Sequence, residues 1–186
     1  GCLSQGRLMS ALLTVTDLAK DFALPGSWLR RSRLRAVDGV SFAIAPGETF
    51  GLVGESGSGK STIGRMVARL LDPTAGAIEF RGSDWLALRG QDLRAARRAI
   101  QVVFQSPYAS LDPRWRIVDI IGEPLRTHLD LPSQERRKRI AELMTAVGLD
   151  PAMAQRYPHQ FSGGQRQRIA IARAIALDPE LLIADE

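Results

Sequence analysis

The chain has 186 residues, 45% of them hydrophobic, which is enough for one globular domain with a hydrophobic core. Its apolar runs are only a few residues long, whereas a membrane-spanning helix needs about 20, and no signal-peptide pattern is visible. The single cysteine, Cys2, cannot form an internal disulfide, so nothing indicates an oxidising compartment.

The net charge of +5 comes from 25 Lys and Arg residues against 20 Asp and Glu residues. This excess is compatible with nucleic acid, nucleotide phosphates or an anionic membrane face as partner. The arginines gather in two clusters: Arg30, Arg31, Arg33 and Arg35, then Arg136, Arg137 and Arg139. A solvated surface is the alternative interpretation of both clusters, and composition does not decide between them.

Hydrophobic patterning predicts the following elements in chain order. Short strands are expected over 12–15 and 40–44, and a nearly continuous apolar strand, buried on both faces, over 48–53. A helix from about 60 to 71 follows, because its apolar residues have the spacing of one buried stripe and Asp72-Pro73 ends it. Further strands are expected over 77–80 and 100–104.

From about residue 106 to 160 the pattern becomes mainly helical. The clearest helix there follows Ser133 and stops at Gly148. Ser162 is expected to cap another helix, which runs to Leu177, and 181–184 is one more buried strand. Alternating strands and helices imply an α/β domain with a parallel sheet, into which the segment 106–160 is inserted as a helical subdomain. We expect residues 1–11 to be leader or vector-derived residues and 12–186 to be the domain itself.

The strongest local motif is an unbroken G-x-x-x-x-G-K-S. Its glycines allow several backbone N–H groups to converge on one anion, and the following helix adds its positive end. Lys60 supplies a cation for the β and γ phosphates, Ser61 offers a hydroxyl to Mg²⁺, and Thr62 can add a hydrogen bond. The alternative is a flexible loop that matches by chance, but the predicted strand before it and helix after it are the required context. The predicted nucleotide-binding residues here are Gly54, Glu55, Ser56, Gly57, Ser58, Gly59, Lys60, Ser61 and Thr62.

The last predicted strand runs directly into two carboxylates. Asp185 is predicted to hold Mg²⁺ beside Ser61, and Glu186 to orient and polarise the attacking water. The alternative is a strand that simply meets solvent at a polar end.

The segment Phe161-Ser162-Gly163-Gly164-Gln165 resembles the signature of ABC ATPases. Its serine and glycines open a helix whose N–H groups can bind a phosphate. The resemblance implies a P-loop NTPase fold, the ABC nucleotide-binding domain, with a parallel-sheet ATPase core, an inserted helical subdomain, and ATP and Mg²⁺ as ligands. It also implies that two such domains pair head to tail, so that the signature of one domain contacts the nucleotide bound by the other. The signature residues expected to make this contact are Ser162, Gly163, Gly164 and Gln165.

The same resemblance assigns further site residues. It implies that Gln105 contacts both Mg²⁺ and the attacking water. The expected catalytic residues of the ATPase are then Lys60, Gln105 and Glu186. Phe22 matches the aromatic residue that stacks on adenine, with packing in the core as the alternative. Trp28 is a weaker candidate for that role.

A narrower resemblance, over about 12–186, is to the ATPase subunits of oligopeptide and dipeptide importers. It rests on segments 36–42, 105–114 and 120–125. It implies a peripheral motor on the cytoplasmic face of the membrane whose helical segment docks on membrane-spanning permease subunits. The other implied partners are a second ATPase subunit, in a homodimer or heterodimer, and indirectly an extracytoplasmic peptide-binding protein. No nucleic acid is expected.

In the family, the chain continues after the catalytic glutamate into a dimer-contact loop and a strand with a histidine that senses the γ-phosphate. Here the sequence stops at Glu186, and both histidines, His128 and His159, precede the acidic strand. We therefore expect a fragment of a longer ATPase. Two alternatives stay open: a non-transport ABC ATPase acting on nucleic acid or ribosomes, and a non-catalytic nucleotide-binding fragment.

Overall fold

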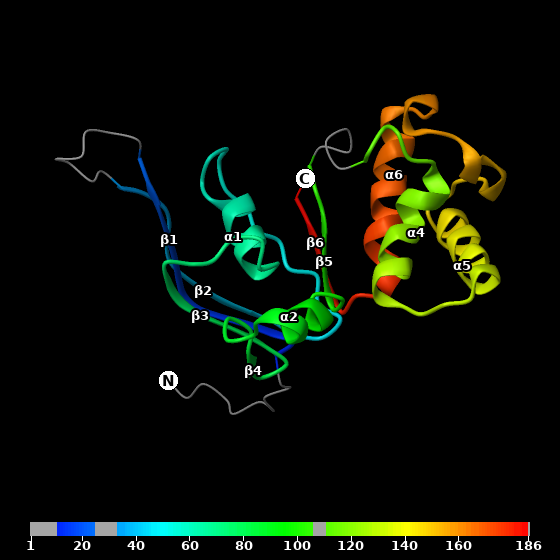
Figure 1. Ribbon diagram of the computed structural model, residues 1–186. Coiled ribbons are helices and arrows are strands. Elements are labelled where there is room, and N and C mark those ends of the chain that lie inside the picture. The colour runs from blue at the N-terminus through cyan, green and yellow to red at the C-terminus, as the bar shows by residue number, and fades with distance from the viewer. Residues whose placement is uncertain (1–10, 25–32, 106–110, 186) are drawn as a thin grey trace. The chain divides into compact units, whose positions relative to one another are not determined.

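The computed structural model describes residues 11–24, 33–105 and 111–185, and the chain divides into two compact units, residues 1–90 and 91–186. Each unit contains its own sheet and at least one helix (Figure 1). Within the described ranges, no helix has both the length and the apolar character needed to cross a bilayer.

The first unit is built on a four-stranded antiparallel sheet with the order β2-β1-β3-β4. The strand pair β1–β2 runs from Leu13 opposite Ile44 to Ala23 opposite Arg33. The strands predicted over 12–15, 40–44 and 77–80 are all present, and each is longer than expected. They pair antiparallel, whereas parallel strands were expected from the sequence. The elements are β1 (Leu13–Ala23), β2 (Arg33–Ile44), α1 (Lys60–Val67), β3 (Ala75–Phe80) and β4 (Ser83–Asp84).

A bulge in β1 keeps its apolar residues on the buried face. Leu13 and Val15 are buried two residues apart, but the next buried residue is Leu18, because the strand register shifts between them. Asp17 within the bulge has φ 47°, and Gly76 of β3 passes so close that an added Cβ would lie 2.5 Å from the Asp17 carbonyl oxygen. The close approach and its own φ of +94° explain the glycine at this position.

The prediction of a strand over 48–53 is wrong. These residues lie outside any strand, and Phe50, Leu52 and Val53 are exposed, Val53 by 95%. An apolar run indicates a tendency toward burial, but a strand also needs hydrogen-bonding neighbours. No strand in the described residues pairs with this segment, and the described parallel pair, β5 with β6, belongs to the second unit.

The predicted end of the first helix is also wrong, because α1 stops at Val67 rather than near Leu71. Arg69 adopts a left-handed conformation with φ 56°, and the N–H of Leu70 donates to the Arg65 carbonyl oxygen at 2.9 Å. The N–H of Arg69 donates to the Met66 carbonyl oxygen at 3.0 Å. This pair of bonds is a Schellman motif. It has arginine where glycine is usual, so no residue pattern predicted the end of the helix here.

The second unit combines a two-stranded parallel sheet with a helical cluster. The helices predicted after Ser133 and after Ser162 are confirmed, and Gly148 has the φ of +71° expected at a helix stop. The elements from the unit boundary onward are α2 (Gly90–Ala96), β5 (Ile100–Val103), α4 (Ile117–His128), α5 (Ser133–Ala146), the short 3₁₀ helices Pro151–Gln155 and Pro158–Gln160, α6 (Gly163–Ala174), the 3₁₀ turn Ile175–Leu177 and β6 (Leu181–Ala184).

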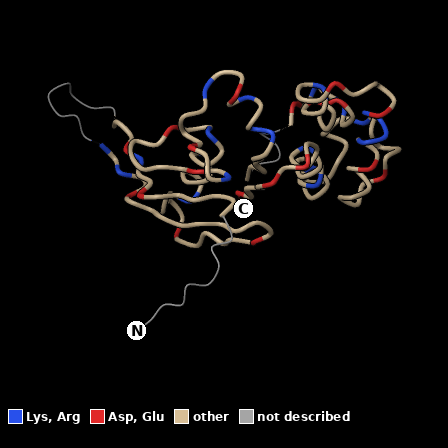
Figure 2. Tube along the Cα trace, turned by 90° about the horizontal axis from the view of Figure 1, so that it is seen from below, with Lys and Arg blue, Asp and Glu red and all other residues tan. Residues whose placement is uncertain are grey.

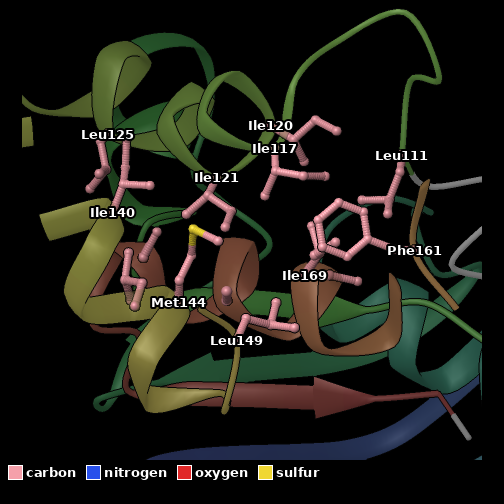
Figure 3. Close-up of a cluster of buried hydrophobic side chains, with 14 residues drawn as sticks. Leu111, Ile117, Ile120, Ile121, Leu125, Ile140, Met144, Leu149, Phe161 and Ile169 are labelled. Atoms are coloured by element: carbon pink, nitrogen blue, oxygen red, sulfur yellow. The ribbon is translucent and has the colours of Figure 1, made fainter. Parts of the chain in front are cut away.

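The helical cluster has its own hydrophobic core (Figure 3). Side chains of α4, α5 and α6 fill it, and the ring of Phe161, just before α6, lies beside Leu111. This core includes residues of α6 and so extends beyond the segment 106–160 that was predicted as a helical subdomain. The limits of the subdomain itself remain a prediction. The strand β6 is less buried than predicted, with Leu182 exposed by 42%, because β5 is its only strand neighbour in the described chain.

Acidic and basic residues are interspersed along the traces of both units (Figure 2). In the first arginine cluster, Arg35 forms ion pairs with Asp21 at 3.0 Å and Asp38 at 2.9 Å. In the second, Arg139 pairs with Asp178 at 2.5 Å. These pairs support the interpretation of both arginine clusters as solvated surface whose charge is balanced by nearby carboxylates. Arg30 and Arg31 of the first cluster lie outside the described part of the chain.

Candidate nucleotide-binding site

The glycine-rich loop of the first unit requires glycine at its last turn. Gly59, which precedes α1, has φ +93°, and an added Cβ would lie 2.4 Å from the Ala36 carbonyl oxygen. Gly57 has φ +83° with open space around it, and an added Cβ at Gly54 would meet the Ser58 hydroxyl at 2.7 Å. The loop backbone is therefore held close to β2 and leaves no room for side chains at Gly59.

The lysine of the motif is held by the loop itself. The Lys60 Nζ donates to the carbonyl oxygens of Gly54 and Glu55, both at 2.7 Å. The first bond inside α1 is donated by Ile63 N–H to the Gly59 carbonyl oxygen at 2.9 Å, and the N-cap residue, Gly59, has no side chain with which to cap this helix end. The amides of the first turn thus point out of the helix together with its positive dipole end, beside a fixed ammonium group. This arrangement fits the phosphate chain of a nucleotide.

Two residues that the sequence analysis missed fix the other end of α1. The indole Nε1 of Trp85 donates to the Val67 carbonyl oxygen at 2.8 Å. The guanidinium of Arg69, 7% exposed, donates to the carbonyl oxygens of Trp85 at 3.2 Å and Leu86 at 2.8 Å. A cation at a helix C-terminus is favourable, so α1 is anchored where its dipole is negative and left open where it is positive. A Trp shortly after a predicted strand was a weak signal that could have indicated such an anchor.

Phe22, the candidate adenine platform, lies near the end of β1 and is not part of the core. Its side chain is 36% exposed, which argues against the packing alternative. Leu34 of β2 lies opposite it in the strand register, and the Lys20 ammonium lies over the ring, 5.4 Å from its centroid. Trp28, the weaker candidate, lies outside the described residues.

In the second unit, two predicted site residues lie at one edge of the parallel sheet. Val103 of β5 is opposite Ala184 of β6, and the N–H of Asp185 donates to the Val103 carbonyl oxygen at 3.0 Å. Gln105 follows β5 by two residues, so it and Asp185 both come directly after the carboxyl ends of paired strands. Polar groups gathered at such an edge are typical of α/β ligand sites. The predicted catalytic Glu186 lies outside the described residues.

Asp112, seven residues after Gln105, has a carboxyl group with a lowered pKa. Arg114 bonds to Asp112 through Nε at 3.0 Å and Nη2 at 2.8 Å, and its backbone N–H donates to the same carboxylate at 3.0 Å. These bonds, with the side-chain bond the larger cause, lower the pKa of Asp112 to about 2. The turn before α4 is therefore held by a local charged pair.

The signature-like segment forms a capping box at the start of α6. The Ser162 hydroxyl accepts from the Gln165 N–H at 3.3 Å, and the Gln165 Oε1 accepts from the Ser162 N–H at 2.9 Å. An added Cβ at Gly163 or Gly164 would meet nothing within 4 Å, and neither glycine has a positive φ. The described residues of this unit therefore do not require glycine at these two positions.

A site for Mg²⁺ needs oxygen donors. No group of three or more His, Cys, Asp or Glu side chains in the described ranges could hold a metal ion by itself. The predicted donor set is instead one hydroxyl, one amide and one carboxylate, from Ser61, Gln105 and Asp185. This set suits Mg²⁺, which takes few protein oxygens and completes its shell with water and phosphate oxygens.

The glycine loop with its lysine and its uncapped helix defines a nucleotide-binding domain. The sequence model of the family described as "ABC transporter" matches residues 37–186. The chain therefore belongs to the ABC transporter family.

Two known relatives show where in the family it stands. It is 51% identical over 178 residues to the oligopeptide transport ATP-binding protein AppF of Bacillus subtilis (strain 168), covering 94% of this chain and 54% of AppF. It is 53% identical over 177 residues to the glutathione import ATP-binding protein GsiA of Escherichia coli (strain K12), covering 94% of this chain and 28% of GsiA. The resemblance to peptide-importer ATPases is thereby confirmed, although the chain spans about half of AppF and less of GsiA.

Solved structures confirm the predicted fold class. The dimeric, post-hydrolysis structure of the ATP-binding cassette MJ0796 bound to ADP and Pi matches with a TM-score of 0.83 at 31% identity, covering 94% of this chain and 73% of that one. CbiO1 from Clostridium perfringens, part of the ABC transporter complex cbiONQ, matches with a TM-score of 0.76 at 27% identity, covering 95% and 65%. The fold is that of an ABC nucleotide-binding domain.

Proposed function

We propose that the protein is the ATP-binding and ATP-hydrolysing subunit of an ABC importer for oligopeptides or dipeptides. The observation that supports ATP binding most strongly is the loop from Gly54 to Lys60. Two of its carbonyl oxygens hold the Lys60 ammonium group, and it leads into the uncapped start of α1. The cargo class is inferred from the relatives, one named for oligopeptide transport and one for import of glutathione, itself a tripeptide.

Each proposed site residue has a separate role in this function. The loop amides and Lys60 bind the β and γ phosphates, and Phe22 stacks on adenine. Ser61, Gln105 and Asp185 are the proposed ligands of Mg²⁺, which neutralises phosphate charge when bound. Glu186 orients water for attack on the γ-phosphorus and polarises it, the bond to the β–γ bridging oxygen breaks, and ADP and phosphate result.

The proposed working form is a head-to-tail pair of such domains on permease subunits at the cytoplasmic face of the membrane. The open surroundings of Gly163 and Gly164 support a close approach by a partner's nucleotide, with Ser162 and Gln165 holding the helix start in place. The dimeric MJ0796 structure and the cbiONQ complex support pairing and a membrane partner respectively. An extracytoplasmic peptide-binding protein would act on the permease rather than on this chain.

Nucleotide binding is tested by calorimetric titration of the chain with Mg-ATP. Lys60→Ala is expected to weaken binding by about 100-fold or more, because the phosphates lose a cation. The free energy of unfolding should fall by no more than about 2 kcal/mol, because the exposed loop loses only the two hydrogen bonds from Nζ to the Gly54 and Glu55 carbonyl oxygens. Lys138→Ala, at an exposed position of α5, is the matched control and should bind as the unaltered chain does. Equal binding by Lys60→Ala and Lys138→Ala would contradict the proposed site.

Transport requires the whole protein in its own cells. A strain in which the full-length protein has Glu186→Gln is expected to lose uptake of a labelled dipeptide or tripeptide, while the purified variant still binds Mg-ATP. Normal uptake in that strain would exclude peptide import as its function. Tight, salt-sensitive binding of nucleic acid by the purified protein would instead favour a non-transport ABC ATPase.

A further inference from the structure

The ring of Phe22 has a fixed cation on one of its faces. The Lys20 Nζ lies over the ring at 5.4 Å from the centroid, within the range of a cation–π contact. A base that stacks on Phe22 must therefore take the opposite face. Leu34, opposite Phe22 in the register and exposed, extends the apolar surface beside the ring.

The Lys20 ammonium is itself anchored to the backbone that follows α1. Its Nζ donates to the Asp72 carbonyl oxygen at 2.6 Å. The neighbouring residues of β1 are tied to the same segment, since Thr74 N–H donates to the Ala19 carbonyl oxygen at 2.8 Å and Asp21 N–H to the Thr74 hydroxyl at 3.0 Å. One network within the first unit thus connects the exit of the phosphate-loop helix to the aromatic ring.

We propose that Lys20 is a positioning residue for base recognition: bound to the Asp72 carbonyl and to one face of Phe22, it fixes the ring so that the other face receives the purine of the nucleotide. This inference rests on the proposed ATP-binding function. A lysine side chain has many rotamers, and anchoring the half-buried Lys20 on a carbonyl next to the ring removes that freedom before the nucleotide binds. The benefit is confined to ligands that contain a base.

The experiment compares Mg-ATP with inorganic tripolyphosphate, which has the phosphates but no base, by calorimetric titration of the full chain. Lys20→Met keeps the length of the side chain and removes its charge. It is expected to weaken ATP binding by about three- to fivefold, the range of an exposed cation–π contact, and to leave tripolyphosphate binding unchanged. Unchanged tripolyphosphate binding also shows that the variant is folded. Lys20→Arg, which keeps a cation of similar reach, is expected to restore ATP binding.

A double-variant cycle isolates the contact with the ring. In a Phe22→Leu background, Lys20→Met should have no further effect on ATP affinity. If Lys20→Met lowered the affinity for ATP and for tripolyphosphate equally, the proposal would be overturned, because Lys20 would then act on the phosphates or on the fold. An undiminished effect in the Phe22→Leu background would overturn it as well. Failure of the unaltered chain to bind either ligand would refute the proposed function itself.

Discussion

The indole N–H of Trp85 donates a hydrogen bond of 2.8 Å to the carbonyl oxygen of Val67, the last residue of α1. Trp85 is only 2% exposed, and its ring lies 5.4 Å from that of Phe80 at the end of β3. The bond satisfies one of the carbonyl groups that any helix leaves unpaired at its C-terminus. It also ties the helix that begins at the phosphate loop to the antiparallel sheet of the same unit.

Trp85→Phe is expected to lower the free energy of unfolding by about 2 kcal/mol. The substitution keeps an aromatic ring but leaves a buried carbonyl oxygen without its donor and a small void in the core. Urea unfolding measures the change. Trp115→Phe is the control, since Trp115 is 38% exposed and its change should lie within about 0.5 kcal/mol. Equal stability of the two variants would mean that the Trp85–Val67 bond does not stabilise α1.

Gly59→Ala is expected to damage both stability and nucleotide binding. The alanine would have to adopt φ +93° and place its Cβ 2.4 Å from the Ala36 carbonyl oxygen, at a cost of about 2 kcal/mol or more. The control is Gly47→Ala, at φ +75° with nothing within 4 Å, which should cost about 1 kcal/mol and leave ATP binding intact. Urea unfolding and calorimetry measure both. If Gly59→Ala behaved like Gly47→Ala, the close approach to β2 would have no role.

Features that depend on neighbouring residues were predictable from the sequence. The serine and glutamine of the capping box are three residues apart, the glycine loop is contiguous, and the buried stripe of α5 repeats at helical spacing. In each case the chemistry and the geometry are set within one or two turns of chain, so the residue pattern contains the answer.

Features that depend on distant residues were not predictable. The left-handed conformation of Arg69 is compensated by carbonyl oxygens at Trp85 and Leu86, sixteen and seventeen residues away, and no local pattern indicates that compensation. The segment 48–53 has the composition of a buried strand, but pairing decides whether a strand forms. The same limit applies to the sheet order β2-β1-β3-β4, which depends on which strands meet rather than on their composition.

Gly163→Ala is expected to separate stability from catalysis. An alanine at this first position of α6 has open space and an ordinary φ, so the free energy of unfolding should be unchanged or higher by up to about 1 kcal/mol. ATP turnover by the full-length protein should nevertheless fall by about tenfold or more, if a partner's nucleotide approaches this backbone closely. Ser162→Ala is the contrasting variant, which should lose about 1 kcal/mol because its cap is removed. Normal turnover by Gly163→Ala would contradict the proposal that a partner's nucleotide approaches this backbone closely.

His128, the last residue of α4, should make the stability of the second unit depend on pH. Burial is the main cause that lowers the pKa of its imidazole, and the positive charges of Arg94 and Arg98 lower it further, against an opposing effect of Glu123. In the unfolded chain the imidazole has its ordinary pKa of 6.5. As the pH falls through 6.5, the unfolded state therefore binds a proton before the folded state does, and the free energy of unfolding decreases until the pH passes below the folded-state pKa.

His128→Gln should remove this part of the pH dependence, because glutamine does not titrate. Urea unfolding of the unaltered chain and the variant at several values from about pH 5 to about pH 8 measures it, and the two curves should diverge below about pH 6.5. An NMR titration of the imidazole checks the cause, since Arg94→Met should raise the pKa of His128 by removing one of the two repelling charges. Parallel unfolding curves over the whole range would show that His128 is as protonated in the folded state as in the unfolded one.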